Sequence, residues 1–543
     1  MGDWNYANIL ERIAAAIPDA PAQVMGDRVF TWAEWHRRAN GVAQHLIDAG
    51  LTHQSKVAAY LYNCPEYFET YLAAFKAGMT PVNTNYRYAD DEIVYLFDNA
   101  DAEAVVFHAE FAPLITRVKD RLPQVKAWIV VDDPPAAGSH GNEAPSFATP
   151  YETAAALGTD VHVQGPWGRS GDDLLLLYTG GTTGMPKGVM WRQDDLFQVL
   201  GGGGNPLIGV PAATSLDELA SRITGPGSVM MPACPMMHGT GQFSCFVNQA
   251  GGGSLVCLDN RSFSAERIFD TIEAQKVNAL VIVGDAFARP LLAALEDNPN
   301  RWDLSPLFVM SSSGVMWSQE TKDGLMKAHP QLICFDSLGS SEAVGLASST
   351  SAGGAASGTA AFKIGDRVKV LMEDGTPVAA GSDDIGMVSI AGYIPVGYYK
   401  DEAKSALTFK TFDGVRYSTP GDFAQVLEDG SIHLLGRGSV CINTGGEKVF
   451  PEEVEEVLKT HGDVVDAVCV GLPDDRFGEA ICAVVELEPG HDLDEASVIE
   501  HVKARLARYK APKRVVVIDT IGRAANGKVD YTRLKAYALD QLE

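Results

Sequence analysis

The 543-residue sequence has no long uninterrupted apolar stretch. Its longest apolar runs, LLLLY at residues 174–178 and ALVIV at 279–283, are far shorter than the roughly 18 residues that a membrane-spanning helix needs. The first residues, MGDWNYANIL, contain neither a basic segment nor an apolar core, so they do not predict a secretion signal. Tyr6 stands where an N-myristoylation signal has Ser or Thr. We therefore expect no membrane span, export signal or lipid anchor.

Positive charge is scarce relative to negative charge. The chain has 43 Lys and Arg against 70 Asp and Glu, which gives a formal net charge of −27. Nucleic acids and anionic membranes both bind positively charged surfaces, so the composition argues against either as a main partner. A small anion needs only local positive charge and is not excluded.

Paired cysteines are absent as well. The eight cysteines are scattered, and no two form a CxxC motif. Buried free thiols in a reducing compartment are the simplest interpretation, which predicts a cytoplasmic protein. The cysteines in apolar or small-residue stretches are Cys234, Cys245, Cys257, Cys334, Cys469 and Cys482.

What the sequence does contain is an alternation of strand and helix patterns. SLVCL at residues 254–258 and NALVIV at 278–283 are short apolar runs typical of buried strands. Between them, Ile268, Phe269 and Ile272 recur on one helical face after the candidate N-cap Ser264. Strand, helix and strand at this spacing indicate parallel βαβ units, so we predict an α/β fold.

A separate pattern begins near residue 437. Helices are predicted over residues 452–460 and 496–508, and strands over 465–471, 481–487 and 514–518. We therefore expect a large N-terminal domain of stacked βαβ subdomains over residues 1–437. A small, mobile α+β domain should follow over residues 438–543, with a hinge near Ser439.

A glycine- and threonine-rich segment follows four consecutive leucines, and residues 174–191 read LLLLYTGGTTGMPKGVMW. Glycines let backbone N–H groups approach phosphate oxygens, threonine hydroxyls add donors, and Lys187 adds a positive charge. The spacing is that of neither a Walker A motif nor GxGxxG. The pattern therefore predicts a phosphate-binding loop of another kind.

The segment YTGGTTGMPKG resembles the signature of the acyl-adenylate-forming enzymes, which include acyl-CoA synthetases, adenylation domains of peptide synthetases and luciferases. Further motifs match in the expected order over nearly the whole chain. VGYYKDE at residues 396–402 and GRGSVCINTGGEKVFPEEVE at 436–455 resemble AMP-forming fatty-acyl and actinobacterial steroid side-chain acyl-CoA synthetases.

The resemblance implies a reaction in two steps. A carboxylate attacks the α-phosphorus of ATP and displaces pyrophosphate, and the thiol of CoA then attacks the acyl-adenylate and releases AMP. ATP, CoA and a small carboxylic acid would be substrates, and Mg²⁺ would accompany ATP.

The resemblance also assigns residues to the nucleotide. Glu342 and Thr182 would help to hold Mg²⁺, and Asp336 would bind the adenine amino group. Asp422 would accept hydrogen bonds from the ribose hydroxyls, and Arg437 would contact ribose or phosphate. The implied nucleotide-binding set is Thr179, Gly180, Gly181, Thr182, Thr183, Lys187, Ser313, Gly314, Asp336, Ser337, Leu338, Gly339, Ser341, Asp422 and Arg437.

Lys528, in AANGKVD at residues 524–530, resembles the C-terminal lysine of the family. It would bridge the carboxylate and the α-phosphate in the first step. Gly445 and Gly446 would face the active site after the small domain rotates, where they would let the pantetheine arm of CoA pass closely. We expect two conformations, one with Lys528 in place and one with Gly446 in place.

His238, in PACPMMHGTG at residues 232–241, resembles a family histidine that lies near the substrate carboxylate. It completes a catalytic set with Lys528, Glu342 and Thr182. Met237, Gly241 and Asp285 are further candidates for acyl or CoA binding, together with His238. The adjacent methionines and the glycines at residues 251–253 favour a long or wide apolar acid, such as a fatty acid or a steroid side-chain acid.

Alternatives stay open on the residues alone. The same chemistry could load a separate carrier protein, act on an aromatic or short-chain acid, or precede a luciferase-like oxidation. Homodimers are common among enzymes of the resembling type.

Overall fold

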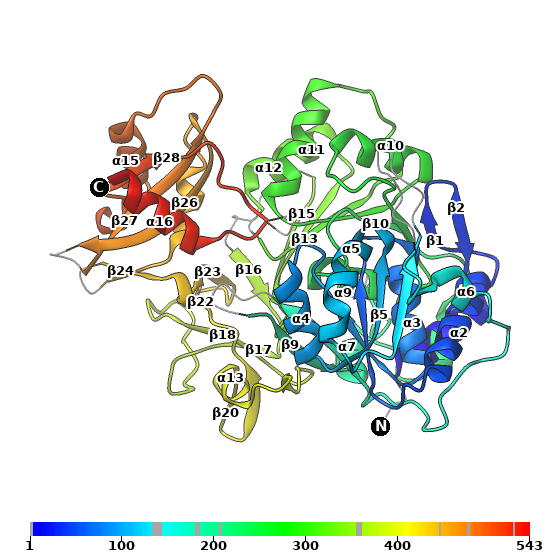
Figure 1. The fold of residues 1–543 in the computed structure, drawn as a ribbon. Helices are drawn as coiled ribbons and strands as arrows, with labels where there is room; N and C mark the ends of the chain where they lie inside the picture. The colour runs from blue at the N-terminus through cyan, green and yellow to red at the C-terminus, as the bar shows by residue number, and fades with distance from the viewer. Residues whose placement is uncertain are drawn as a thin grey trace.

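The structure is a computed structural model that describes residues 4–132, 144–179, 185–205, 209–315, 317–353, 361–444, 447–474, 478–524 and 527–542. Within these residues the strands form two large sheets and one small sheet. The small sheet belongs to a C-terminal lobe, orange to red in Figure 1, that lies to one side of the large domain. The predicted α/β class, with a large N-terminal and a small C-terminal domain, is confirmed.

One large sheet carries the predicted leucine strand near its centre. Its strand order is β19-β9-β8-β4-β3-β5-β6-β7, and the pairs from β8 through β4, β3, β5 and β6 to β7 are parallel. The strands are β3 (Lys56–Tyr60), β4 (Thr80–Asn83), β5 (Ala102–His108), β6 (Ala127–Val131), β7 (Thr149–Pro150), β8 (Leu174–Thr179), β9 (Lys187–Arg192) and β19 (Gly397–Tyr398).

The other large sheet changes from parallel to antiparallel pairing. Strands β1, β11, β10, β12, β13 and β14 are parallel neighbours, and from β14 to β15 onward the pairs are antiparallel. Its strands are β1 (Pro21–Met25), β2 (Arg28–Thr31), β10 (Val229–Pro232), β11 (Ser254–Cys257), β12 (Ala279–Ile282), β13 (Val309–Ser313), β14 (Ile333–Ser340), β15 (Ala343–Ser351), β16 (Ala361–Ile364), β17 (Val368–Leu371), β18 (Gly386–Ala391), β20 (Phe409–Phe412), β21 (Val415–Ser418), β22 (Asp422–Val426) and β23 (Ile432–Arg437).

Helices alternate with the parallel strands, as the sequence predicts. Ser264 is the N-cap of α10, because its side chain accepts a hydrogen bond from the N–H of Arg267. The helices of the large domain are α1 (Tyr6–Ala16), α2 (Trp32–Asp48), α3 (Pro65–Lys76), α4 (Asp90–Asn99), α5 (Ala112–Val118), α6 (Tyr151–Ala155), α7 (Gln193–Val199), α8 (Leu216–Arg222), α9 (Gly239–Ala250), α10 (Ala265–Gln275), α11 (Asp285–Asp297), α12 (Gln319–Ala328) and α13 (Glu402–Thr408).

The C-terminal lobe has its own core on both faces of its sheet. Val454 and Val498 pack on one face, and Leu534 and Ala538 on the other. The lobe consists of β24 (Ile442–Thr444), β25 (Glu447–Val449), α14 (Pro451–Leu458), β26 (Val464–Asp474), β27 (Gly478–Leu487), α15 (Glu495–Lys503), β28 (Arg514–Val517) and α16 (Tyr531–Leu542). Helix α15 ends at Lys503, five residues before the predicted bound, and the chain turns there and forms a separate short 3-10 turn at Arg508–Lys510 before β28.

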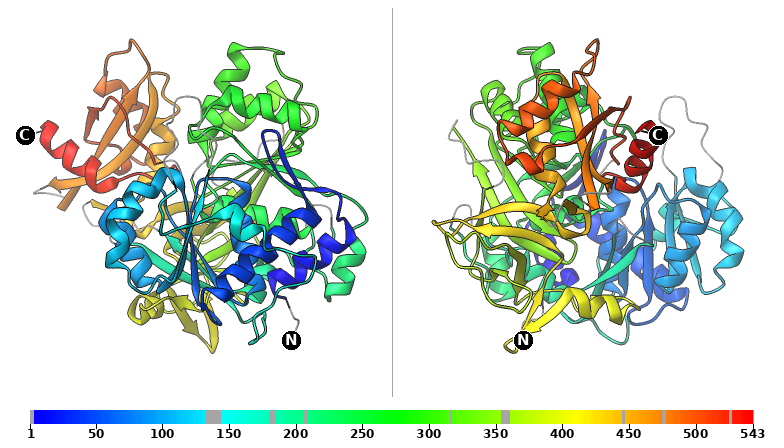
Figure 2. Two further views of the ribbon diagram at one scale, coloured as in Figure 1. Left: turned by 45° about the vertical axis from the view of Figure 1, so that its right-hand side comes forward. Right: turned by 90° about the vertical axis from the view of Figure 1, so that its left-hand side faces the viewer.

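The two views of Figure 2 show the lobe next to the helices that follow β12 and β13, on the same side of the large domain. The described residues contain no helix that is both long and apolar enough to cross a bilayer. The cysteines that the sequence places in apolar stretches are buried free thiols, as predicted.

Candidate active site

The carboxyl ends of two parallel strands bring predicted nucleotide-binding residues together. In the register of β13 and β14, Ser313 is the partner of Ser337. Gly314 follows Ser313 directly, and Leu338 and Gly339 continue β14. These two segments, separate in the sequence, therefore meet at the sheet edge where open parallel sheets bind ligands.

Asp336, the predicted adenine ligand, is buried and already has a charged partner. Its Oδ2 accepts a hydrogen bond from Nζ of Lys322 at 3.0 Å, and Lys322 is itself buried on α12. Burial raises the pKa of the Asp336 carboxyl, while the charge on Lys322 acts in the opposite direction. Adenine recognition by Asp336 stays a prediction.

Glu342, the predicted metal ligand, lies in the turn between β14 and β15. The hydroxyl of Tyr398 donates to Oε1 of Glu342 at 2.8 Å, and Oγ of Ser418 donates to its carbonyl at 2.6 Å. The preceding carbonyl, of Ser341, accepts a hydrogen bond from Nε1 of Trp191 at 2.9 Å. Residues from both large sheets thus fix the turn.

The predicted phosphate loop connects β8 to β9. These strands are antiparallel, and Thr179 lies opposite Lys187 where the hairpin opens. The loop residues Gly180, Gly181, Thr182 and Thr183 lie outside the described residues, so their contacts stay predictions.

A carboxylate from a distant segment holds Lys187. Its Nζ donates to Oδ2 of Asp401 at 2.5 Å. Asp401 is also the N-cap of α13, because its Oδ1 accepts the N–H of Lys404 at 2.9 Å. The cation is thereby kept at the base of the phosphate loop.

The predicted ribose ligands lie at paired backbone positions of two neighbouring strands. Asp422 on β22 is the register partner of Arg437 on β23, and the Asp422 side chain is buried. The antiparallel register therefore places the backbones of the two motifs side by side, as a shared ligand would require.

The segment that carries Lys528 reaches the large domain, and the red chain before α16 can be followed there in Figure 1. Gly527 has φ of +71°, and a Cβ at this position would lie 2.7 Å from Cγ2 of Val315 and 3.4 Å from Cγ1 of Val283. Only glycine fits so close an approach with this backbone conformation.

The imidazole of His238, in the large domain, is affected by the charge of Lys528 in the small domain. Burial, followed by the charges on Lys528 and Arg87, lowers the pKa of His238 to about 3. The imidazole is therefore neutral near pH 7. Lys528 of the small domain therefore lies close enough to His238 of the large domain for its charge to act on the imidazole. The two conformations of the small domain stay a prediction.

Asn83, which no pattern in the sequence singles out, ties this histidine loop to the phosphate-loop strand. Its Nδ2 donates to the carbonyls of Tyr178 and Met237 at 2.8 and 2.6 Å. Met237 is buried, and Gly241 lies in the first turn of α9. Two further residues support the site: Tyr398 contacts Glu342, and Asp401 contacts Lys187. The sequence indicated them only through the family-like segment VGYYKDE, which contains both.

The glycines at residues 251–253 do not serve the purpose expected of them. A Cβ at Gly252 would lie 3.1 Å from Cδ1 of Ile17 and 3.2 Å from Cγ2 of Ile223, and one at Gly253 would lie 2.5 Å from the side chain of Asn248. Close packing accounts for the lack of bulk at Gly252 and Gly253, so these two glycines give no support for a wide acyl site.

Asp285, a predicted acyl or CoA contact, joins two helix starts. Its Oδ1 accepts hydrogen bonds from the N–H and Oγ of Ser318 at 3.0 and 3.1 Å, and its Oδ2 lies 3.5 Å from Nε of Arg289. It also lines a cavity of about 920 Å³ between the large and small domains. Gly445 and Gly446 lie outside the described residues.

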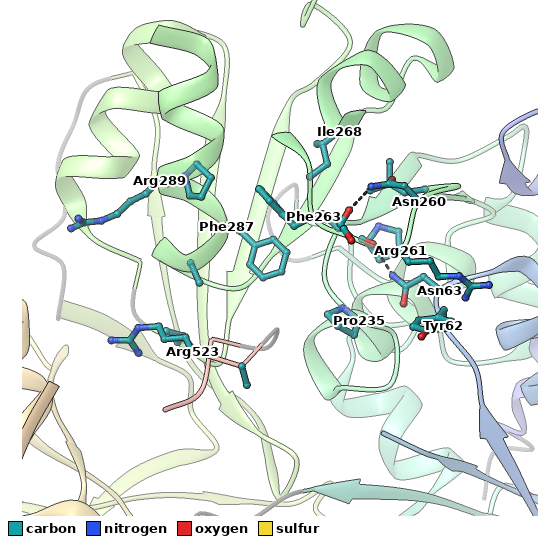
Figure 3. A pocket seen from close by; sticks show the side chains of 18 of the residues that line it. Tyr62, Asn63, Pro235, Asn260, Arg261, Phe263, Ile268, Phe287, Arg289 and Arg523 are labelled. Carbon is teal, nitrogen blue, oxygen red and sulfur yellow. Dashed lines mark hydrogen bonds between the residues drawn. The ribbon is translucent and has the colours of Figure 1, made fainter. Parts of the chain in front are cut away.

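Figure 3 shows this cavity, with Arg289 and Arg523 on one side and Tyr62 and Arg261 on the other. Among the described lining residues, six cationic side chains slightly outnumber five acidic ones, in a chain whose net charge is −27. Nη1 of Arg289 donates to the carbonyl of Val465 at 2.8 Å, which is a direct hydrogen bond between the domains.

Known proteins share both the sequence and the fold. A sequence model of AMP-binding enzymes matches residues 10–399, and a model of the AMP-binding enzyme C-terminal domain matches residues 453–528. The chain belongs to the AMP-binding enzyme family. The resemblance to acyl-adenylate-forming enzymes is thereby confirmed, and so is the expectation of an enzyme.

Full-length relatives of this AMP-binding enzyme are CoA ligases. A medium/long-chain-fatty-acid–CoA/3-oxocholest-4-en-26-oate–CoA ligase of Mycobacterium tuberculosis is 41% identical over 528 residues, covering 97% of this chain and 95% of the relative. A 3-oxocholest-4-en-26-oate–CoA ligase of Rhodococcus rhodochrous is 40% identical and covers 97% and 94%.

Solved structures show the same fold. The anthranilate CoA ligase AuaEII in complex with anthranoyl-AMP superposes with a TM-score of 0.83 at 21% identity, covering 99% of this chain and 98% of that one. ATP-bound MatB from Rhodopseudomonas palustris has a TM-score of 0.78 at 24% identity, covering 98% and 100%.

Proposed function

We propose that the protein is an AMP-forming acyl-CoA ligase that activates an apolar carboxylic acid with ATP and transfers the acyl group to CoA. The observation that carries the proposal is the approach of the Lys528 segment to His238 and to the ends of β12 and β13. Relatives about 40% identical over nearly the whole length are named as CoA ligases, which supports the same chemistry.

The first step brings a carboxylate to a polyanion, so catalysis depends on positioning and charge neutralisation. Lys528 would bridge the carboxylate and the α-phosphate as charge redistributes. Lys187 and the backbone N–H groups of residues 180–184 would bind the phosphates. His238, which burial keeps neutral, would lie beside the carboxylate without adding charge.

Glu342 fits a magnesium ion that accompanies ATP. Its Oε1 accepts the hydrogen bond from Tyr398, and its Oε2 has no hydrogen-bond partner within the part of the chain that the structure describes. Carboxylate oxygen is the ligand type that Mg²⁺ prefers. Glu342 and Thr182 would hold the ion, which when bound supplies positive charge beside the phosphates.

The second step would follow a rotation of the small domain. Strand β23 ends at Arg437 and β24 begins at Ile442, so the connection between the domains is short and contains the proposed hinge near Ser439. After rotation, Gly445 and Gly446 would replace Lys528 at the site. Cationic side chains of the interdomain cavity, such as Arg289 and Arg523, would contact the phosphates of CoA.

For the acid we propose a medium- or long-chain fatty acid or a steroid side-chain acid, on the names of the relatives. The buried methionines Met236 and Met237 beside His238 are compatible with an apolar acid. We also propose a cytoplasmic location, in keeping with the free thiols, and a homodimer.

The test is pyrophosphate release with acetate, octanoate, palmitate, benzoate and 3-oxocholest-4-en-26-oate, with and without CoA. We expect acyl-AMP without CoA and acyl-CoA with it. The kcat/KM should be at least about a hundredfold higher for the preferred apolar acid than for acetate, since each buried methylene contributes about 0.8 kcal/mol. Equal values for acetate would contradict the substrate proposal, and transfer only to a holo-carrier would contradict CoA as acceptor.

A further inference from the structure

Tyr398 is the residue through which a short strand reaches the predicted metal ligand. It lies on β19, which pairs with β9 so that Tyr398 is opposite Val189. The side chain is only 6% exposed, and its ring packs against Phe409 with centroids 5.8 Å apart. From this fixed position its hydroxyl donates to Oε1 of Glu342 at 2.8 Å.

The backbone of Tyr398 is fixed as well. Its N–H donates to Oγ of Ser405 at 2.8 Å, and that Oγ donates to the carbonyl of Asp401 at 2.7 Å. The ring centroid lies 5.9 Å from Nζ of Lys187. Tyr398 thus stands between the cation at the phosphate loop and the carboxylate in the β14–β15 turn.

We propose that Tyr398 is a positioning residue that orients Glu342 toward the cation of the metal–ATP complex. The inference rests on the proposed function, because it takes Glu342 as a ligand of that cation. The phenol occupies one carboxylate oxygen and fixes the side-chain orientation, so that the other oxygen is presented to the ion. Hydrogen bonds of this kind behind a metal ligand commonly set its orientation and basicity.

The chain offers a matched pair of variants for the test. Tyr398→Phe removes the hydroxyl and keeps the ring that packs on Phe409. Tyr399→Phe removes the hydroxyl of the next residue, which donates to Oδ2 of Asp101 at 2.7 Å on the surface. Each variant loses one hydrogen bond from a tyrosine to a carboxylate, but only one of these carboxylates is Glu342.

The measurement is Mn²⁺ affinity by electron paramagnetic resonance, in the presence of the ATP analogue with a methylene bridge between the α- and β-phosphorus atoms. The analogue cannot release pyrophosphate, so the readout is independent of turnover. Tyr398→Phe should weaken Mn²⁺ binding by about 10- to 100-fold, the range typical for a group that supports a metal ligand. Tyr399→Phe should bind as the wild type does, and saturating metal should restore most of the kcat of Tyr398→Phe.

A second comparison separates this inference from the proposed function. In a Glu342→Ala background, adding Tyr398→Phe should change Mn²⁺ affinity no further, because the tyrosine acts through the carboxylate. If Glu342→Ala weakens Mn²⁺ binding and Tyr398→Phe does not, the positioning role is overturned while the metal site stands. If Glu342→Ala itself leaves Mn²⁺ binding unchanged, the metal role in the proposed function fails instead.

Discussion

Lys187 and Asp401 are 214 residues apart in the sequence, yet Nζ of Lys187 lies 2.5 Å from Oδ2 of Asp401. The antiparallel pairing of β9 with β19 brings the two segments together. The cation at the predicted phosphate loop is therefore positioned by a segment that is distant in the sequence and directly follows β19. Because the Lys187 side chain is already held by Asp401 before a nucleotide binds, binding costs less side-chain conformational entropy.

Replacement of Lys187 by Gln should weaken ATP binding more than it slows turnover. A hydrogen bond to a charged group contributes about 1.5–3 kcal/mol. Because the Lys187 side chain is partly exposed, we take the lower value, which corresponds to a rise of about tenfold in the KM for ATP. Initial rates of pyrophosphate release at varied ATP concentration give the value. Lys404→Gln, an exposed lysine on α13, is the control, and equal KM values for the two variants would contradict the role of Lys187.

Replacement of Lys528 by Ala should separate the two steps. Loss of one electrostatic donor at a developing charge commonly costs roughly 10²–10³ in rate, so acyl-AMP formation should fall by that factor. Transfer to CoA from supplied acyl-AMP should stay within a few-fold of the wild type. Lys535→Ala on α16 is the matched control, since its side chain pairs with Glu479 at the surface. Equal losses in both steps would argue against domain alternation.

Sequence patterns predict helices and strands well where the structure of a segment depends mainly on its own residues. The four leucines of β8 and the Ser264 cap of α10 are examples, because strand burial and capping depend on neighbours in the sequence. The family motifs also placed Asp422 and Arg437 in one ribose site, and the β22–β23 register brings their backbones together.

The supporting residues could not be predicted because their partners are distant in the sequence. Asn83 acts on Tyr178 and Met237, which are 95 and 154 residues away, and Asn occurs after many strands for other reasons. The glycines at residues 251–253 show the opposite error. Their lack of bulk suggested a tunnel, whereas only the structure reveals Ile17 and Ile223 against Gly252 and Asn248 against Gly253.

Burial is the main cause of the low pKa of His238, and the charge on Lys528 lowers this pKa further. The charge on Lys528 contributes to the low pKa of about 3, so Lys528→Gln should raise the pKa of His238. Histidine Cε1–H chemical shifts over a pH series, assigned with His238→Gln, would report it. Between pH 6.5 and 3 the unfolded chain binds a proton here that the folded chain does not, so stability through this residue falls as the pH falls through that window. An unchanged pKa in Lys528→Gln would place the lysine elsewhere.

Replacement of Arg289 by Met should loosen the observed domain arrangement. The variant keeps the apolar stem of the side chain but loses the hydrogen bond of 2.8 Å from Nη1 to the Val465 carbonyl, which joins α11 to β26. If this arrangement is the one that forms acyl-AMP, adenylation should slow by several-fold to about tenfold, since a hydrogen bond with a charged donor is worth about 1.5 kcal/mol or more. Transfer from supplied acyl-AMP should be unchanged or faster, because the Arg289–Val465 hydrogen bond no longer stabilises the observed arrangement relative to the rotated one. Arg301→Met, a half-exposed arginine near Asp270, controls for a general loss of charge. A slower transfer step with normal adenylation would instead assign Arg289 to the CoA-bound conformation.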